Sequence, residues 1–498
     1  MSDEIVSTIV DRVVRDRAAQ WLGQAGVQLP TFAELANPSR IPEASRSALR
    51  SVAPDCPEPA NLFRVHWYND RTRASFAATP SHLVFPPALT GVRSPILMGL
   101  GCFFPLIGAH KVLAAFGCLI PRLVTGRFDP ARHKAVWPST GNYCRGGIAI
   151  SRILNCRGIA VLPEGMSEER FDWLRVWTPR PEDVVRTPGS ESSVKEIYDK
   201  CAELALDPDN VILNQFAEFG NYVAHYACTG PALAQVFEAA QTTRPHLRLA
   251  AFVAASGSAG TLAAGDYLKK VSGARIIAAE ASECPTLLRN GFGEHNIQGI
   301  GDKHVPYIHN VMNTDIVVGV SDRSTGSLDL LFNSETGLSY LASRRHVDSE
   351  LLSGLKLMGL SGIANLVAAI KLAKRLDLGE EDAILTVATD SAALYGSERR
   401  KFLTANYPHG FDTVSAGEVF GQHLLGAADN DVLELTHNER SRIFNLGYYT
   451  WVEQQGVPLE TFERRRAKGF WAELQHAAPA LDMLINEFNA VAGLEKGR

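Results

Sequence analysis

The stretch WPSTGNYCRGGIAISRILNCRG, residues 137–158, places a run of polar side chains between two apolar segments. Pro138 and Gly141 predict a turn, because proline fixes φ and glycine permits conformations closed to larger residues. Apolar residues after Asn142 recur at helical spacing. The stretch therefore predicts a strand-to-helix turn whose hydroxyl and N–H groups surround a helix N-terminus, a position suited to anions. Taken alone, it favours ordinary helix capping by Ser, Thr and Asn.

The composition is typical of a globular protein of two or three packed units. The chain has 498 residues, of which 46% are hydrophobic and 21% charged, with a net charge of −5. Acidic and basic residues are mixed along the chain, which argues against a nucleic-acid partner. No apolar run is long enough to span a bilayer, and the charged N-terminus does not resemble a signal peptide. We expect a cytoplasmic protein without a membrane partner.

The eight cysteines are scattered and form no CxxC pair, and the fourteen histidines show no metal-ligand spacing. This pattern is typical of reduced thiols in a cytoplasm. The sequence therefore predicts neither a disulfide framework nor a metal centre.

The chain is predicted to contain three zones. Residues 1–83 form an N-terminal extension that begins with an amphipathic helix over 4–22, and residues 401–498 form a helical C-terminal extension. Residues 84–400 alternate short apolar runs with helical patterns, which predicts an α/β fold with parallel sheets covered by helices. The expected strands are 158–164, 211–216, 249–256, 274–280 and 383–389, and the expected helices include 221–241, 260–270 and 357–376.

A second turn, ASGSAGTLAAGDYLKK at residues 255–270, follows one of these strands and opens a helix. Small residues and hydroxyls in this position permit close backbone approach and favour phosphate binding over a simple packing loop. A dinucleotide is one possible phosphate ligand, with Glu280 placed to bind a ribose. The loop departs from GxGxxG, so a nucleotide-dependent oxidoreductase is the more distant alternative.

A lysine stands in the apolar stretch FPLIGAHKVLAAFGCLI, residues 104–120. Lys111 has no local carboxylate, so its amine either snorkels to solvent or is desolvated. Desolvation lowers the pKa of a lysine and makes its amine a nucleophile toward carbonyl groups. Taken alone, the stretch favours snorkelling.

A further strand, in AILTVATDSAALYGS at residues 383–397, is predicted to carry Ser391 to the carboxyl edge of the sheet. By itself this serine is an ordinary cap. Together, a lysine amine, a phosphate-type turn, a hydroxyl-rich turn and a serine at a strand end are the set that pyridoxal phosphate requires.

At this point the sequence resembles the fold-type II pyridoxal-phosphate enzymes, specifically the cysteine synthase and cystathionine β-synthase family. The resemblance implies a two-domain fold like that of the tryptophan synthase β chain, with a smaller lobe at about 118–225. The matching stretches occur in the family's order and are 138–175, 214–231, 257–265, 297–306, 361–373 and 389–395.

The resemblance implies a role for each site residue. Lys111 is expected to link covalently to the cofactor and to transfer protons, and Asn142 to bind the ring hydroxyl. Ser391 is expected to meet the pyridine nitrogen. The phosphate would be held by Gly257, Ser258, Ala259, Gly260 and Thr261. The substrate carboxylate would be held by Ser139, Thr140, Gly141 and Gln215.

Three positions depart from the family's pattern. Val112-Leu113 replaces the usual Asp-Arg, Ala259 replaces a glycine, and Tyr143 replaces a small threonine. Tyr143 is expected to narrow the substrate space. Cys56 and His66 lie upstream, where some cystathionine β-synthases bind haem, but their spacing is loose and we expect no haem.

The resemblance implies β-replacement or β-elimination on cysteine, serine or O-acetylserine-type amino acids through an aminoacrylate. A neutral serine at the ring nitrogen makes a modest electron sink, which favours loss of a β-substituent over transamination. A threonine or serine dehydratase, a threonine synthase-like enzyme and a relative that binds the cofactor without catalysis stay open as alternatives. Relatives are often dimers, and we expect a homodimer.

Overall fold

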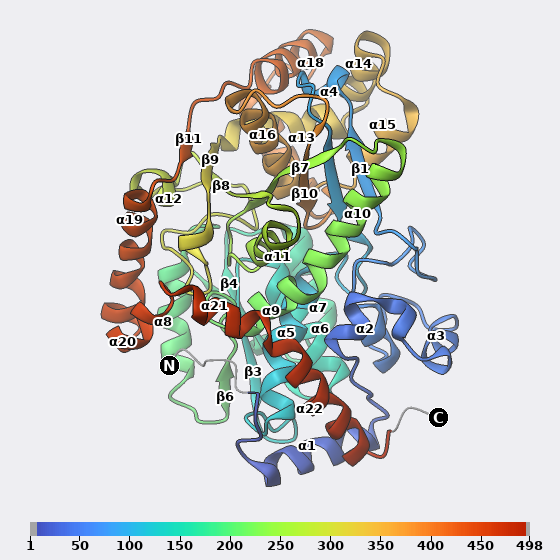
Figure 1. The fold of residues 1–498 in the computed structure, drawn as a ribbon, viewed down its shortest axis with the longest axis vertical. Coiled ribbons are helices and arrows are strands. Elements are labelled where there is room, and N and C mark those ends of the chain that lie inside the picture. Colours follow the sequence, from blue (N-terminus) through green and yellow to red (C-terminus); the bar gives the residue numbers. More distant parts are fainter. Residues whose placement is uncertain (1–6, 495–498) are drawn as a thin grey trace.

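Two β-sheets organise the chain in the computed structural model, which describes residues 7–494 (Figure 1). The larger sheet has the order β1-β2-β10-β7-β8-β9-β11. Its inner strands are parallel, and the edge strands β1 and β11 are antiparallel to their neighbours. The strands are β1 (His82–Phe85), β2 (Ile96–Leu100), β7 (Arg248–Ala255), β8 (Arg275–Ala281), β9 (Ile316–Val320), β10 (Asp382–Ala388) and β11 (Val432–Glu434).

The smaller sheet has the order β5-β4-β3-β6 and is parallel throughout. Its strands are β3 (Lys134–Pro138), β4 (Arg157–Pro163), β5 (Val184–Thr187) and β6 (Asn210–Ile212).

The inner strands of the larger sheet are buried on both faces, as their continuous apolar sequences predict. Along β7, Ala251 and Val253 pack in one hydrophobic core, while Phe252 and Ala254 pack in another. This alternation follows from the two-residue period of a strand. Each face of the sheet therefore needs its own cover of helices.

Helices supply that cover. Helix α16 packs on β7, β9 and β10, and helix α11 packs on β7 and β8. The helices are α1 (Arg12–Gln24), α2 (Phe32–Ala36), α3 (Glu43–Leu49), α4 (Pro87–Thr90), α5 (Lys111–Val124), α6 (Asn142–Ile153), α7 (Glu168–Trp177), α8 (Val194–Leu204), α9 (Phe219–Ala224), α10 (Gly230–Thr243), α11 (Leu262–Ser272), α12 (Thr286–Arg289), α13 (Asp322–Asn333), α14 (Glu335–Arg345), α15 (Ser349–Leu355), α16 (Leu360–Arg375), α17 (Gly396–Asn406), α18 (Thr413–Phe420), α19 (His437–Tyr448), α20 (Leu459–Arg464), α21 (Lys468–Gln475) and α22 (Ala477–Val491).

Shorter helical turns connect these elements. The π-helical turns are η5 (His225–Thr229), η8 (Gly421–Leu425) and η9 (Tyr449–Gln454). The 3₁₀ turns are η1 (Pro38–Arg40), η2 (Pro59–Arg64), η3 (Gly101–Phe103), η4 (Pro181–Asp183), η6 (Val311–Asn313) and η7 (Ala392–Leu394).

The predicted α/β class with two parallel-type sheets is confirmed. Strand β6 is shorter than the predicted 211–216, because Asn214 forms a turn in which its side chain accepts the Phe216 N–H. Helix α1 begins at Arg12 rather than at residue 4, because the Asp11 carboxylate caps it by accepting the Val14 N–H. Residues 4–6 of that prediction lie outside the described residues. The predicted zone boundaries stay predictions.

The C-terminal extension is helical apart from β11, which adds an antiparallel edge to the larger sheet. Its last helix, α22, lies against α1 and α2 from the opposite end of the chain (Figure 1). Asn489 on α22 donates to the Leu29 carbonyl at 2.8 Å and accepts the Leu29 N–H at 3.0 Å. The two extensions therefore form one docked layer.

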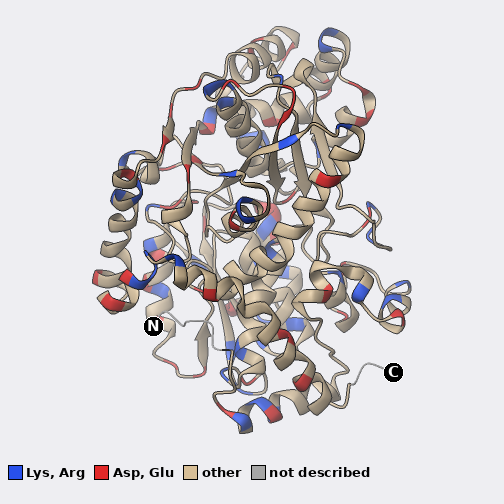
Figure 2. Ribbon diagram, viewed as in Figure 1, with Lys and Arg blue, Asp and Glu red and all other residues tan. Residues whose placement is uncertain are grey.

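Charged residues are interspersed over the whole ribbon, without a segregated basic stripe (Figure 2). None of the helices within residues 7–494 combines the length and apolar character needed to traverse a bilayer. The absence of a nucleic-acid partner stays a prediction.

Replacing Asn489 with Ala tests the docking of the two extensions. The change leaves the buried N–H and C=O of Leu29 without partners, so we expect the free energy of unfolding in urea to fall by about 3 kcal/mol. Asn406→Ala is the control, because its amide bonds only the Phe402 carbonyl of its own helix. Equal effects of the two substitutions would contradict the docking role.

Candidate active site

Lys111 is the first residue of α5, a helix that is otherwise almost entirely buried. The lysine side chain is 9% exposed and donates to Ser258 Oγ at 3.3 Å. Within residues 7–494, no carboxylate lies within salt-bridge distance of its amine. Burial lowers the pKa of Lys111 to about 8, and the charge of Asp302 opposes that shift. The amine is thus desolvated rather than snorkelling, and the lowered pKa increases the fraction of neutral, nucleophilic amine near neutral pH.

The turn after β7 lies directly against this amine. Gly257, Ser258, Ala259 and Thr261 line the same cavity as Lys111. Ala259 adopts φ +63°, the left-handed region that favours glycine, although it carries a side chain. Gly260 packs against the amide of Asn221, which also donates to Ser258 Oγ at 3.0 Å. The predicted phosphate-type turn and the predicted lysine are therefore brought together.

The far wall of the cavity comes from α16 and the end of β10. Ser361, Asn365 and Thr389 line it, and Asn365 Oδ1 is buried without a hydrogen-bond partner. These residues lie in the stretches 361–373 and 389–395 that resemble the family, but no role was predicted for them. The signal available was their position at the carboxyl edge of a strand and at a helix start.

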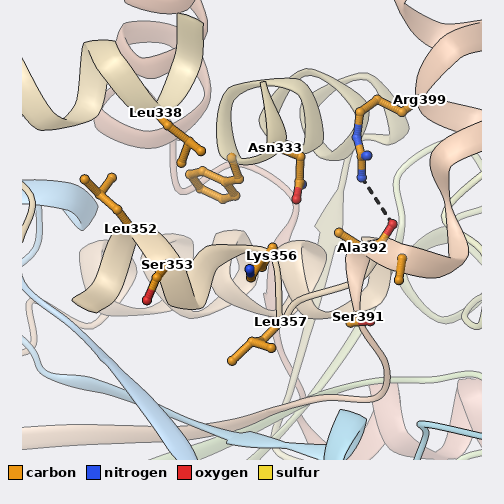
Figure 3. Close-up of a pocket in the computed structure, with 11 residues that line it drawn as sticks. Asn333, Leu338, Leu352, Ser353, Lys356, Leu357, Ser391, Ala392 and Arg399 are labelled. Atoms are coloured by element: carbon orange, nitrogen blue, oxygen red, sulfur yellow. Dashed lines mark hydrogen bonds between the residues drawn. The ribbon is translucent and has the colours of Figure 1, made fainter. Parts of the chain in front are cut away.

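Ser391 does not line this cavity. The chain turns after β10 into η7, which carries Ser391 into a separate surface cavity of about 580 Å³ (Figure 3). There it lies with Lys356 and Leu357, below Asn333 and Arg399. The expected placement of Ser391 beside the lysine is not what the structure shows, and Thr389, two residues earlier, occupies that position instead.

The turn at residues 139–141 connects β3 to α6 as predicted. Gly141 has φ +146°, and an added Cβ would lie 2.6 Å from Arg170 Cδ, so only glycine fits. Ser139 Oγ accepts the Gly141 N–H at 2.9 Å. The Thr140 hydroxyl hydrogen-bonds to the Glu191 carboxylate. The predicted turn is therefore present, and its Thr140 hydroxyl contacts the carboxylate of Glu191.

Asn142 belongs to a buried polar network that connects the two sheets. Its side chain donates to Asp390 Oδ2 at 2.6 Å and accepts from Arg145 at 2.9 Å. Asp390 also accepts from the Tyr395 hydroxyl at 2.7 Å and lies 3.8 Å from the Arg170 guanidinium. Both ends of the Asn142 amide are therefore engaged, and the residue does not line the Lys111 cavity.

Two carboxyl groups near Lys111 were missed by the sequence analysis. Glu191 is 1% exposed and Asp302 is 6% exposed, and each has one carboxyl oxygen without a hydrogen-bond partner. Burial raises the pKa of Glu191 to about 7, against the charge of Arg170. Burial, followed by the charge of Glu191, raises the pKa of Asp302 well above its ordinary value. Asp302 lies in the stretch 297–306 that resembles the family, but no role was predicted for it, and Glu191 lies outside every matching stretch.

Other predicted positions have structural roles. The Glu280 carboxylate accepts the N–H groups of Leu287 and Leu288 at 2.9 and 2.8 Å, which leaves no oxygen oriented for a ribose. Tyr143 stacks edge-on against Trp137 and donates to the Leu213 carbonyl, so it packs in the core instead of narrowing the cavity.

Gln215 is buried, and its side-chain oxygen has no partner. Cys56 is exposed whereas His66 is fully buried.

This arrangement defines an α/β protein with a buried lysine amine beside a Gly- and Ser-rich turn that precedes a helix. The family model described as pyridoxal-phosphate dependent enzyme matches residues 79–343, more than half of the chain. The protein belongs to that family, and the predicted cofactor, pyridoxal phosphate, is confirmed by this membership.

Relatives assign the branch of the family. The chain is 28% identical to a cysteine synthase of Staphylococcus aureus over 262 residues, which cover 52% of this chain and 74% of that protein. It is 29% identical to a probable cysteine synthase of Bacillus subtilis, covering 59% and 86%. The structure of an O-acetylserine dependent cystathionine beta-synthase from Helicobacter pylori matches with a TM-score of 0.50 at 25% identity, covering 64% and 95%. The protein is thus an enzyme of the cysteine synthase and cystathionine β-synthase branch.

The residues around the cavity fit this cofactor. A free lysine amine faces a turn whose N–H groups precede α11, and the N-terminus of a helix favours a phosphate group. The unpartnered Asn365 Oδ1 and the Thr389 hydroxyl supply polar contacts on the opposite wall. None of the residues lining the cavity is acidic, as expected where a phosphate group binds.

Gly257→Ala tests the phosphate turn. An added Cβ would lie 2.7 Å from the Gly299 carbonyl oxygen, so the turn must shift. We expect the affinity of the cofactor-free protein for pyridoxal phosphate to fall at least about tenfold, or about 1.4 kcal/mol, in equilibrium dialysis. Gly469→Ala is the control, since nothing lies within 4 Å of its added Cβ. Unchanged binding by Gly257→Ala would disprove the turn's role.

The pKa of Lys111 sets a pH dependence for cofactor uptake. Only the neutral amine attacks a carbonyl, so the rate of covalent uptake by cofactor-free protein should rise with pH and level off above the pKa of about 8. Stopped-flow absorbance measures this rate. An ordinary lysine, with a pKa of about 10.4, would give a rate that still climbs steeply at about pH 9.5, and such a profile would contradict the desolvation of Lys111.

Proposed function

We propose that the protein catalyses pyridoxal-phosphate-dependent β-replacement or β-elimination on cysteine, serine or O-acetylserine-type amino acids. The observation that carries the proposal is the desolvated Lys111 amine beside the Ser258 turn, in a chain whose relatives include cysteine synthases. The cofactor, when bound, supplies an electron sink that acidifies the Cα–H bond of an amino acid.

Lys111 has two roles in the proposal. Its neutral amine attaches the cofactor, and its Nζ accepts the Cα proton once substrate has replaced it. A buried lysine with a pKa of about 8 is suited to both, because it exchanges protons near the working pH.

The remaining residues bind and orient. Ser258, Gly260 and the N–H groups before α11 would hold the phosphate group. Ser139, Thr140 and Gly141 would hold the substrate carboxylate, and the Gln215 side chain would donate to it through its Nε2. Asn142 would reach the ring hydroxyl by exchanging one of its present partners.

The Thr389 hydroxyl is the group we assign to the ring nitrogen in place of Ser391. A hydroxyl is neutral, so the ring would not be held protonated as it would be by a carboxylate. A modest electron sink favours prompt loss of the β-substituent over transamination.

Lys111→Ala and a substrate panel test this proposal. Purified protein is expected to form cysteine from O-acetylserine and sulfide, or pyruvate and ammonia from cysteine or serine, with at least about a thousandfold loss in Lys111→Ala. Lys134→Ala is the control, since Lys134 pairs with Asp207 outside the site. Turnover of threonine alone, or turnover that survives Lys111→Ala, would contradict the proposal. A cytoplasmic homodimer stays a prediction.

A further inference from the structure

Glu191 and Asp302 come from two different loops that are fastened to each other. Glu191 is flanked by Ser190 and Ser192, and both serine hydroxyls hydrogen-bond to Glu294. Ser192 Oγ also donates to the Gly293 carbonyl at 2.8 Å. Since Glu294 and Asp302 lie in the same loop, these contacts fix the position of Glu191 relative to Asp302.

The surroundings of the two carboxyl groups are unequal. Arg170, the Thr140 hydroxyl and the Gly299 N–H all favour the ionised form of Glu191. Lys111 alone favours the ionised form of Asp302, which also faces the charge of Glu191. When two neighbouring buried carboxyl groups share one proton, it resides on the group whose anion has fewer partners. These surroundings favour the ionised form more strongly at Glu191 than at Asp302.

The pair also lies next to the reacting space. Both carboxyl groups interact electrostatically with Lys111, yet neither comes within 4.0 Å of its amine within residues 7–494. Gly299, whose N–H contacts Glu191, lines the lysine cavity. Asp302 lies two residues after Ile300, which lines the lysine cavity with Gly299, and within residues 7–494 its buried Oδ2 has no hydrogen-bond partner.

We propose that Asp302 is the general acid that protonates the β-leaving group, and that Glu191 is a positioning residue that keeps Asp302 protonated. The inference rests on the proposed function and deepens it. When the bond from Cβ to the leaving atom breaks, the electron pair departs with that atom, which takes the proton of Asp302, while the Cα proton passes to Lys111 Nζ. The incoming thiol or water then returns a proton to Asp302.

A built-in acid indicates the substrate class. Hydroxide is a strongly basic leaving group that needs a proton to depart, and departure of hydrosulfide is assisted by one, whereas acetate leaves readily as an anion. The structure therefore points to amino acids with an unactivated β-hydroxyl or β-thiol, such as serine and cysteine, as substrates.

Asp302→Asn keeps the shape and removes the proton. We expect kcat/KM for L-serine and L-cysteine to fall at least about a hundredfold, and kcat/KM for O-acetyl-L-serine to fall less than about threefold. Asp266→Asn is the matched control, a buried aspartate that accepts from Tyr222, Asn310 and Asn313 away from the site. In Asp266→Asn, the ratio of kcat/KM for serine or cysteine to kcat/KM for O-acetyl-L-serine should equal that of the unmodified protein.

The outcomes separate this inference from the proposed function. Equal losses for all substrates in Asp302→Asn, or no loss for serine and cysteine, would overturn the role of Asp302 alone. An unmodified enzyme that uses O-acetylserine but neither serine nor cysteine would do the same. Failure of the unmodified protein to process any of the three substrates would instead reject the proposed function.

Two further readouts do not depend on the amount of activity. In Glu191→Gln the negative neighbour is gone, so the alkaline limb of the serine pH profile should move to lower pH. In cofactor-free protein, infrared difference spectra between the unmodified chain and Asp302→Asn should show the C=O stretch of a protonated carboxyl group at neutral pH. A pH limb that stays in place and a spectrum without that band would each contradict the proposal.

Discussion

The burial of the Lys111 ammonium group, with no salt-bridge partner among residues 7–494, is the constraint on which the rest of the site depends. A lysine in this position is costly in its charged form, and the cost is reduced when the group gives up its proton. The apolar face of α5 keeps water away, while Ser258 Oγ accepts a hydrogen bond from the amine. Burial thereby favours the neutral form of this amine, which is the form that can attack a carbonyl group.

The surroundings of this amine come from segments far apart in the sequence. The turn after β7, the start of α16 and the end of β10 all lie at the carboxyl edge of the parallel strands, where open α/β sheets place their ligands. A second buried network, built on Arg170 and Asp390, connects the smaller sheet to this edge. Removing one partner of such a buried pair lowers the free energy of unfolding by about 3–5 kcal/mol, so the network also stabilises the contact between the two sheets.

Much of this could be predicted from the sequence, because the relevant signals are local. Apolar strands followed by Gly-, Ser- and Thr-rich turns identified β7, β10 and the turns after β3 and β7, and an unaccompanied lysine in an apolar run identified Lys111. The predictions failed where they depended on the direction of a side chain or on contacts between residues far apart in the sequence. The cavity that Ser391 lines depends on how the chain turns into η7. Glu191 and Asp302 come near each other only because two loops pack together. Neither spacing nor periodicity carries that information.

The most direct test of the central claim is to locate the covalent attachment of the cofactor. Borohydride reduction of the purified protein, followed by proteolysis and mass spectrometry, should place a pyridoxyl group on the peptide that contains Lys111. A pyridoxyl group on another lysine, or on none, would contradict the account.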